Sequence, residues 1–274
     1  MALVPFPKKS TSSDPDDDDW EDDDSESGQG KMSFLDHLDE LRRRIIISLV
    51  AVFVGLGIAL FFMGPLFQFI FQPMQALLPA GQTLIYTDPS EAFFLQIKIA
   101  LMAGLILASP VVASQLWLFI APGLYANEKK LAIPFVVMSS TLFVAGAAFA
   151  HYIVFPIVWR FFVSFTNDFL TFMPRVEPAF SMYLRLVLAL GITFQLPTLV
   201  LFLARLGVVT PRLMVRHFKF AVLIIVIASA VLSPDGGGVG MLAMGGPVII
   251  LYILSIGLAW IFGKKRTKQI EEAS

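Results

Sequence analysis

Two short segments carry acidic side chains that could bind a cationic ligand, and the first of them lies between Ser33 and Arg44. It reads Ser33-Phe-Leu-Asp-His-Leu-Asp-Glu-Leu-Arg-Arg-Arg44, in which Ser33 and Asp36 fit a capping box that begins a helix. Glu40 could accept a guanidinium group, because a carboxylate binds the planar arginine fork in bidentate geometry. The alternative is an ordinary amphipathic helix whose acids pair with arginines one turn further along.

The second segment reads Gln115-Leu-Trp-Leu-Phe-Ile-Ala-Pro-Gly-Leu-Tyr-Ala-Asn-Glu-Lys-Lys130. An apolar, aromatic stretch ends at Pro122-Gly123, and Glu128 follows in what we expect to be a short loop. Taken by itself, Glu128 has two interpretations: a solvated loop acid or a second acceptor for a cationic ligand.

Three polar residues interrupt the apolar stretches. Lys98, Arg185 and Gln195 are functional candidates, because a charge at membrane depth costs about 2.5 kcal/mol or more on insertion scales. Lys98 and Arg185 lie near the ends of their stretches, so snorkelling to the interface is the alternative. Gln195 lies near the middle, before Pro197, where its amide needs a hydrogen bond to another helix. That helix could belong to this chain or to a partner.

Several kinds of chemistry have no motif in the sequence. A phosphate-binding loop, a His-Glu-x-x-His zinc motif and a Gly-x-Ser-x-Gly nucleophile elbow are all missing. The chain has no cysteine, and its histidines are far apart in sequence. We therefore expect a protein that is not an enzyme and that has no cofactor and no metal site.

The elements that position these residues are predicted to be membrane helices. Of the 274 residues, 57% are hydrophobic and 15% are charged, whereas a soluble domain has about 25% charged residues. The apolar residues fall in blocks close to the ~20 residues that cross a bilayer as a helix. We predict an all-α integral membrane protein with six transmembrane helices, at Arg44–Gly64, Ala92–Pro110 with an apolar continuation to Pro122, Leu131–Pro156, Tyr183–Leu203, Phe218–Leu232 and Val239–Phe262.

The distribution of basic residues predicts the orientation. Of the 20 lysines and arginines, Arg160 and Arg175 fall on one side of the predicted spans, and Lys98 and Arg185 fall inside them. All the others fall on the opposite side, which the positive-inside rule assigns to the cytoplasm. We therefore expect both termini to be cytoplasmic (N-in, C-in), in the bacterial inner membrane, with no removable signal peptide.

The connections between the spans are predicted to differ in size. Residues 65–91 and 157–182 form long outward loops, and the apolar stretch Leu66–Phe71 of the first could lie along the membrane interface. Residues 233–238 form a tight turn.

The last two helices are predicted to be short. Phe218–Leu232 reaches about 22 Å at 1.5 Å per residue, whereas the hydrocarbon layer is about 30 Å thick. Gly245-Gly246-Pro247 is predicted to interrupt the last helix, so that Val248–Phe262 is equally short. Such a pair requires local bilayer thinning or burial against a partner helix, and both interpretations stay open.

The chain is predicted to have three parts. Residues 1–30 form a disordered acidic cytoplasmic tail, because they combine a dense run of acids with few apolar residues. Its role is that of a spacer or of a partner-binding arm. Residues 31–263 form the membrane domain, and residues 264–274 form a cytoplasmic tail.

Six segments, in order along the chain, resemble the motifs of one family: His37-Leu-Asp-Glu-Leu-Arg-Arg-Arg44, Thr87-Asp-Pro-Ser-Glu-Ala-Phe-Phe94, Phe119-Ile-Ala-Pro-Gly-Leu-Tyr-Ala-Asn-Glu128, Val154-Phe-Pro156, Phe194-Gln-Leu-Pro197 and Leu232-Ser-Pro-Asp235. The family is TatC, the multispanning receptor subunit of the twin-arginine protein translocase. The resemblance runs from about Phe34 to Phe262 and leaves out the acidic tail. This sequence departs from the family in one place, because no acid follows Pro247 in the last span.

The resemblance implies a receptor for the Arg-Arg signal peptides of folded proteins. It also implies assembly with TatA- and TatB-like single-span subunits, several copies of this chain in one complex, and transport driven by the proton-motive force. Glu40 and Glu128 match the two acids that receive the arginines, and Phe119 and Arg42 belong to the same surface.

The resemblance assigns three further positions. Pro73 and Asp88 match functional residues of the first outward loop. Gln195 matches a position associated with docking of a partner helix.

Two other functions compete with this one. A secondary transporter of a small anion would use Lys98 and Arg185 as ligands, although the sequence shows no internal repeat. A structural scaffold for other membrane helices would bind partners but no peptide.

Overall fold

The computed structural model describes residues 34–79, 81–120, 132–233 and 238–262. Within these ranges the chain is helical, with two isolated β-bridges in its loops, which confirms the predicted all-helical class. The helices are α1 (Phe34–Phe61), α2 (Met63–Ala76), α3 (Pro89–Ile120), α4 (Ala132–Phe149), the π-helix η3 (Ala150–Val154), α5 (Phe155–Val163), α6 (Val176–Thr193), α7 (Leu196–Arg205), α8 (Pro211–Arg216), α9 (Phe218–Leu232) and α10 (Gly238–Phe262). The predicted acidic tail, Glu128 and residues 234–237 of the predicted tight turn lie outside the described residues.

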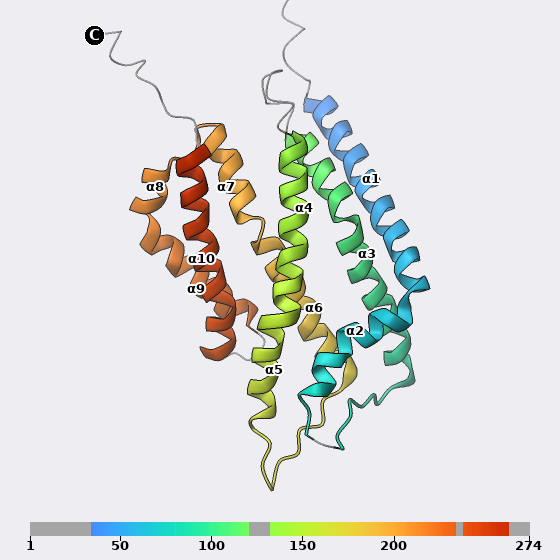
Figure 1. The fold of residues 1–274 in the computed structure, drawn as a ribbon. Helices are drawn as coiled ribbons and strands as arrows, with labels where there is room; N and C mark the ends of the chain where they lie inside the picture. Colours follow the sequence, from blue (N-terminus) through green and yellow to red (C-terminus); the bar gives the residue numbers. More distant parts are fainter. Residues whose placement is uncertain (1–33, 80, 121–131, 234–237, 263–274) are drawn as a thin grey trace, which may run out of the picture. The chain divides into compact units, whose positions relative to one another are not determined.

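The chain divides into two compact units between Leu41 and Arg42. In the first unit the structure describes residues 34–41, which form the opening turns of α1. The second unit holds the remaining helices, which Figure 1 shows as a set of long helices joined by short ones.

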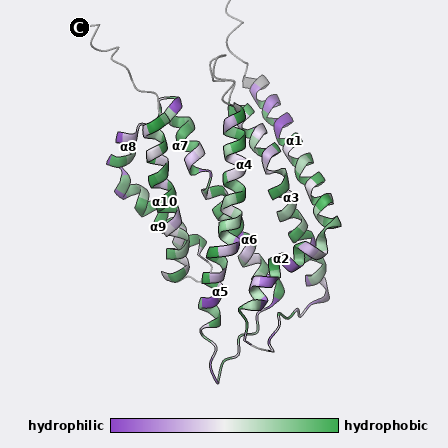
Figure 2. Cartoon of the chain, in the orientation of Figure 1, coloured by the Kyte–Doolittle hydropathy of each residue, from purple (hydrophilic) through white to green (hydrophobic). Residues whose placement is uncertain are grey.

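Five helical stretches are long and apolar enough to cross a membrane: His37–Phe61, Pro89–Ile120, Ile133–Val163, Val176–Arg205 and Gly238–Phe262. Their length is coloured mainly hydrophobic in Figure 2. α9 is a shorter apolar helix of 15 residues, and its bounds agree with the prediction.

The prediction that the last helix is short is wrong. α10 is a continuous helix of 25 residues with Pro247 inside it, which gives a length of about 37 Å. A proline inside a helix removes one backbone hydrogen bond and costs about 3 kcal/mol. Buried residues lie on both sides of the proline, among them Met244 and Leu251. α10 packs on α7, α9 and the stretch from η3 to α5, and this packing outweighs the lost hydrogen bond, so the helix continues.

Pro156 does not end its helix either. The predicted span Leu131–Pro156 continues to Val163, and the backbone widens into η3 immediately before Pro156. Pro156 has no N–H to donate to the preceding turn, and a π-helical turn relieves the clash of its ring with that turn. The helix is therefore distorted rather than broken.

The predicted span Tyr183–Leu203 is two helices. α6 ends at Thr193 and α7 begins at Leu196, with Phe194 and Gln195 in a turn between them. Pro197 lies in the first turn of α7, where its missing N–H costs nothing. The break places Gln195 at a bend in the middle of a long apolar stretch.

Small residues allow α1 to approach α3 closely. A Cβ atom at Gly104 would lie 2.5 Å from the backbone nitrogen of Leu56, and one at Gly55 would lie 2.6 Å from the carbonyl oxygen of Gly104. Ala59, Ala100 and Ala103 continue this contact. Such surfaces are typical of helices that pack in lipid, where close backbone contact supplies the attraction.

The main core joins α2, α3, α6 and the stretch from α4 to α5. Its fully buried side chains include Phe71, Ile99, Phe155, Phe180 and Leu186. The apolar stretch Leu66–Phe71 is therefore part of a helix with one face in the core, while Phe69 on its other face is exposed.

Candidate functional site

The first candidate acid, Glu40, lies near the beginning of α1. Its side chain is half-buried, whereas its neighbour Asp39 and the nearby Arg42 are exposed. Leu38 and Leu41 are spaced so that they follow one side of the helix. Glu40 and Asp39 are thus adjacent acids that differ in how far protein surrounds them, which makes Asp39 a natural control for Glu40.

A cluster of three aromatic rings, here called the aromatic anchor, joins the end of α3, the beginning of α4 and the end of α7. Trp117 of α3 stacks on Phe135 of α4 with ring centroids 5.1 Å apart, and it meets the edge of Phe202 of α7 at 5.0 Å. All three side chains are buried. Offset and edge-to-face aromatic pairs of this kind contribute about 0.5–1.5 kcal/mol each beyond their buried area.

The aromatic anchor fixes where the segment that contains Glu128 leaves and rejoins the helices. α3 ends at Ile120 and α4 begins at Ala132, one on each side of residues 121–131. Phe119, two residues beyond Trp117, is half-buried. Glu128 itself lies outside the described residues, so its role stays a prediction.

Gln195 forms two hydrogen bonds with one serine of α4. The Ser139 hydroxyl donates to Gln195 Oε1 at 2.5 Å, and Gln195 Nε2 donates to the Ser139 carbonyl oxygen at 2.9 Å. The helix that hydrogen-bonds to Gln195 therefore includes α4 of this chain, which was one of the two interpretations of this residue. An amide has two N–H groups and two acceptor lone pairs, so one donor and one acceptor of Gln195 are still available for a further partner.

Pro73 lies inside α2 and is half-buried. The residue after it, Met74, is fully buried, and its carbonyl oxygen accepts a hydrogen bond from the indole nitrogen of Trp159 on α5 at 3.1 Å. Pro73 therefore lies at the point where α2 is fastened to α5.

Asp88 caps the beginning of α3. Its Oδ1 accepts hydrogen bonds from the backbone nitrogen of Ser90 at 2.8 Å and from the Ser90 hydroxyl at 2.7 Å. These two hydrogen bonds favour the charged carboxylate and hold the pKa of Asp88 below its ordinary value. The side chain is exposed, so its role is to fix the geometry of the loop rather than to support the core.

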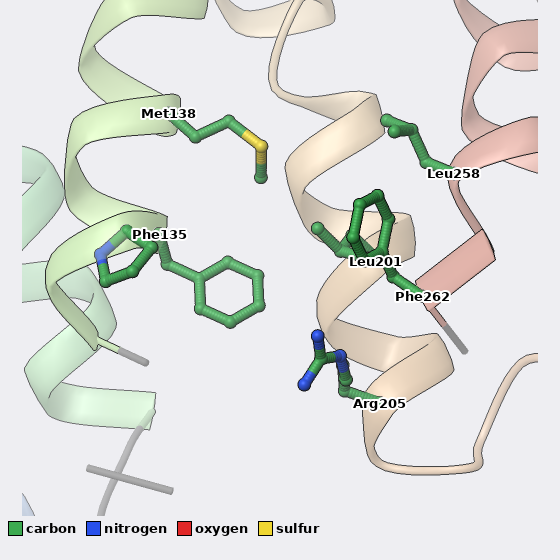
Figure 3. A pocket seen from close by; sticks show the side chains of 7 residues that line it. Phe135, Met138, Leu201, Arg205, Leu258 and Phe262 are labelled. Carbon is green, nitrogen blue, oxygen red and sulfur yellow. The ribbon is translucent and has the colours of Figure 1, made fainter. Parts of the chain in front are cut away.

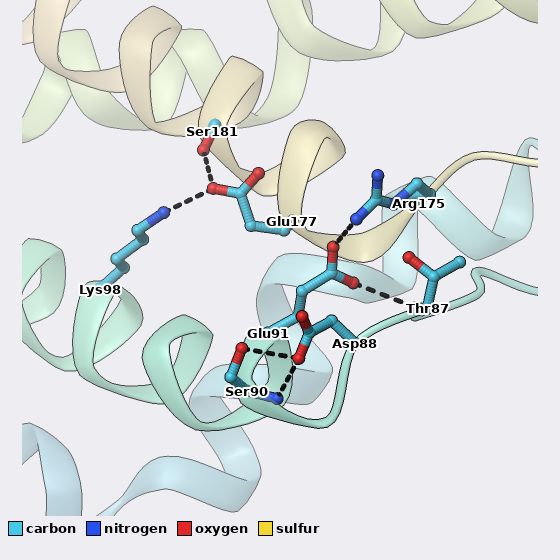
Figure 4. Close-up of polar contacts among 8 residues, drawn as sticks. All are labelled: Thr87, Asp88, Ser90, Glu91, Lys98, Arg175, Glu177 and Ser181. Carbon is cyan, nitrogen blue, oxygen red and sulfur yellow. Dashed lines mark hydrogen bonds and ion pairs between the residues drawn. The ribbon is translucent and has the colours of Figure 1, made fainter.

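Next to Asp88, two ion pairs join the beginnings of α3 and α6, and together they are here called the α3–α6 ion pairs (Figure 4). The first is between Glu91 and Arg175. In the second, Lys98 Nζ lies 2.5 Å from Glu177 Oε1, which also accepts a hydrogen bond from the Ser181 hydroxyl at 2.8 Å. The neighbouring backbone is paired as well, because Ile85 exchanges hydrogen bonds with Pro174 and Val176.

Of the two ligands that an anion transporter would require, Lys98 already has an acidic partner in this chain. Lys98 is bound to Glu177, and Arg185 is exposed on α6. The arrangement gives no support to the transporter interpretation.

Sequence reasoning missed the partners of these residues. Ser139 and Glu177 lie 56 and 79 residues from the side chains they bind, and no pattern in the sequence links such distant positions. It also missed a buried pair between the π-helix η3 and α6, in which His151 Nδ1 lies 3.0 Å from the Tyr183 hydroxyl. The acid in the first turn of α6 was a usable signal for Glu177, since acids are favoured at helix N-termini.

Comparison with known proteins gives consistent matches in sequence and in structure. The family model described as Sec-independent protein translocase protein (TatC) matches residues 36–247. The chain is 38% identical over 245 residues to the protein of that name from Koribacter versatilis (strain Ellin345), a match that covers 88% of this chain and 90% of that protein. It is 37% identical over 244 residues to the protein of that name from Aquifex aeolicus (strain VF5), which covers 88% of this chain and 100% of the other.

A solved structure, the crystal structure of the twin arginine translocase receptor TatC, has the same fold. The TM-score is 0.72 at 37% sequence identity, and the match covers 82% of this chain and 98% of the other.

Proposed function

This chain belongs to the TatC family of Sec-independent protein translocase proteins, and we propose that it is the receptor subunit of a twin-arginine translocase. In that role it is a multi-pass protein of the inner membrane that binds the Arg-Arg signal peptides of folded proteins at its cytoplasmic face. With TatA- and TatB-like single-span subunits, and as several copies within one complex, it exports these proteins using the proton-motive force. The observation that carries the proposal is the family match over residues 36–247, which includes every position assigned to the site.

The proposed topology has six spans with both termini in the cytoplasm. The five long apolar helices and the shorter α9 supply six crossings, and the excess of basic residues on the side of the termini supports the orientation. Residues 1–30 and 264–274 are then cytoplasmic tails on either side of the membrane domain. α9 spans about 22 Å, so the bilayer beside it is thinned or a partner helix covers its ends.

The proposed acceptors of the two arginines are Glu40 and Glu128. Two guanidinium groups require two carboxylates, and each planar fork can bind in a bidentate geometry that a lysine ammonium cannot reproduce. Exposed ion pairs contribute only about 0–1 kcal/mol, whereas a charge-assisted hydrogen bond in partly desolvated surroundings contributes about 1.5–3 kcal/mol. Glu40 is half-buried, which supports the larger contribution of about 1.5–3 kcal/mol for an ion pair at that residue.

Phe119 and Arg42 complete the proposed peptide-binding surface. Phe119 follows the aromatic anchor at the end of α3, so its ring is held at the edge of the segment that contains Glu128. Two such ion pairs supply about half of the ~8 kcal/mol of binding free energy of a micromolar complex. The rest comes from apolar contacts with the hydrophobic stretch of the signal, so the arginines determine specificity more than total affinity.

Gln195 is the proposed docking position for a partner helix. Its amide keeps one donor and one acceptor beyond the two hydrogen bonds to Ser139. The break between α6 and α7 lies at the same point, so Gln195 stands at a bend of the long apolar stretch. Ser139 holds the amide in a fixed orientation for such a partner.

Pro73 and Asp88 are proposed to keep the first outward loop in its functional shape. Pro73 lies where α2 is fastened to α5 through Met74 and Trp159, and Asp88 caps α3 beside the α3–α6 ion pairs. In this arrangement the loop is a rigid cover over the outer ends of α3 and α6.

Binding of a synthetic signal peptide to the purified protein tests the proposal. We expect Glu40→Gln and Glu128→Gln each to weaken binding of an Arg-Arg peptide by about tenfold or more, since each removes a charge-assisted pair. The wild-type protein should bind a Lys-Lys peptide as weakly as the variants bind Arg-Arg. The control is Asp39→Asn, which removes an exposed acid next to Glu40 and should leave binding unchanged. Equal Arg-Arg binding by the wild type and the double variant would overturn the assignment of the two acids.

A further inference from the structure

A pocket of about 220 Å³ lies between α4, α7 and α10 and has no role in the function proposed above. Figure 3 shows Phe135 and Met138 on one wall, with Leu201, Leu258 and Phe262 on the other. Pro134 completes the apolar lining, and the one charged lining residue is Arg205. The walls therefore suit a hydrocarbon chain, and the guanidinium group suits an anion at one end of it.

Arg205 is a cation that needs an anionic partner. Its Nε atom is buried and, within the described part of the chain, has no hydrogen-bond partner. A buried N–H without a partner costs about 1–3 kcal/mol, and more when the group is charged. In Figure 3 the guanidinium group extends toward Phe135, into the opening between α4 and α7.

The sequence around Arg205 offers no acid to neutralise it. Between Pro178 and Pro234 the chain contains no aspartate or glutamate. The residues that follow Arg205 add Arg212, Arg216 and Lys219, and all three are exposed. This end of α7 through α9 is consequently a locally positive region with an apolar pocket beside it.

The position of the pocket along the helices points to the lipid headgroup region. The pocket is lined by residues in the first two turns of α4, the last two turns of α7 and the last two turns of α10. In the topology proposed above these helix ends face the cytoplasm, where the inner leaflet presents anionic headgroups to basic side chains.

We propose that the pocket binds one membrane phospholipid with an anionic headgroup. The phosphate accepts hydrogen bonds from the Arg205 guanidinium, and the upper part of an acyl chain lies between Met138, Leu201 and Leu258. A transmembrane partner helix does not fit, because a helix with its side chains is about 10–12 Å across. A soluble anion would leave the apolar walls unfilled, whereas a phospholipid satisfies both the walls and the cation.

The lipid would connect α4 to the pair formed by α7 and α10, since α7 and α10 pack extensively on each other whereas α4 packs much less on α7. Phe135 of the aromatic anchor lines the pocket, so the bound lipid also supports the helix end next to the proposed peptide-binding surface. This inference does not depend on signal-peptide binding, and the two can fail separately.

Lipid retention by the purified full-length protein tests the inference. The protein is placed in nanodiscs of equal phosphatidylglycerol and phosphatidylcholine, and native mass spectrometry counts the lipids that stay bound after release. We expect the wild type to retain one phosphatidylglycerol with about tenfold preference over phosphatidylcholine, because one charge-assisted hydrogen bond contributes enough binding free energy for a tenfold difference in affinity. Arg205→Gln should reduce that preference to parity.

Two further variants keep the result interpretable. Arg212→Gln removes an exposed arginine of α8 from the same region and should leave the preference unchanged. Met138→Trp fills the pocket without changing the charge and should lower retention of both lipids, while circular dichroism verifies that all variants are folded. The inference is overturned if Arg205→Gln keeps the wild-type preference, if the wild type shows none, or if Met138→Trp retains as much lipid as the wild type.

Discussion

Replacing Trp117 by alanine should separate the ends of α3, α4 and α7 and weaken the proposed peptide-binding surface. The side chain is only 5% exposed and makes two ring contacts, at 5.1 Å with Phe135 and 5.0 Å with Phe202. In lipid or detergent, burying the apolar surface of Trp117 contributes little free energy, because the surroundings are as apolar as the core. The two aromatic pairs remain, and at about 0.5–1.5 kcal/mol each they predict a loss of about 1–3 kcal/mol.

The loss can be measured as a free energy of unfolding in mixed micelles, followed by circular dichroism so that removal of a tryptophan does not affect the signal. The matched control is Trp260→Ala, since Trp260 of α10 is 73% exposed and has little packing to lose. Trp117→Ala should also lower signal-peptide affinity, whereas Trp260→Ala should not. If the two variants were equally stable, the aromatic anchor would not be holding these helices, and the reasoning would be refuted.

Three other changes give expected outcomes that follow from single contacts. Ser139→Ala removes the hydroxyl that donates to Gln195 Oε1 and leaves the backbone carbonyl that accepts from Gln195 Nε2. The free energy of unfolding in micelles should fall by about 0.6 kcal/mol, the mean for such bonds in membrane proteins, and an unchanged value would contradict the hydrogen bond. Asp88→Asn tests the charge on the helix cap, because asparagine keeps the Oδ1 acceptor but cannot ionise. Since the folded-state pKa of Asp88 is lowered, the contribution of its charge is complete above the unfolded pKa and is lost as the pH falls from about 4 through the lower folded value. The variant should therefore be less stable than the wild type at neutral pH, and its stability should depend less on pH below pH ~4. The measurement is the melting temperature of both proteins across that range; curves of melting temperature against pH that run parallel would count against a contribution from the Asp88 charge. Gly104→Ala places a Cβ 2.5 Å from a backbone nitrogen of α1 and should cost about 1–3 kcal/mol, whereas Gly57→Ala on α1 meets nothing within 4 Å and should be tolerated, so equal melting temperatures for the two would disprove the close approach.

The helices were largely predictable because lipid imposes a simple rule on the sequence. Each stretch must be apolar over its length, so hydropathy alone located the long helices and gave the bounds of α9. The rule that proline ends a helix failed at Pro156 and Pro247. Both lie inside long stretches that pack on other helices along their length, and this packing outweighs a single missing hydrogen bond.

The candidate site was predictable in its residues but not in their partners. Gln195 stood out because an amide is costly in an apolar stretch, yet nothing in the sequence indicated Ser139. From the sequence alone, Lys98 could be an anion ligand, because no pattern links it to its partner Glu177, which lies 79 residues away. In the sequence, Arg205 is one basic residue among many on the predicted cytoplasmic side. The pocket beside it could not be predicted, since three helices that are distant in sequence form it.

Photocrosslinking of an Arg-Arg signal peptide tests most directly whether this chain is the receptor. The photoreactive residue is placed in the peptide beside the arginine pair, so that Glu40 and Glu128 stay intact. Crosslinks are then mapped around positions 40 and 128 and, as a matched control, around position 260 on the exposed face of α10. The account predicts crosslinks around positions 40 and 128 that an excess of unlabelled Arg-Arg peptide removes and an excess of Lys-Lys peptide does not, with none around position 260. Crosslinks that are equal at all three positions, or that both competitors remove equally, would contradict it.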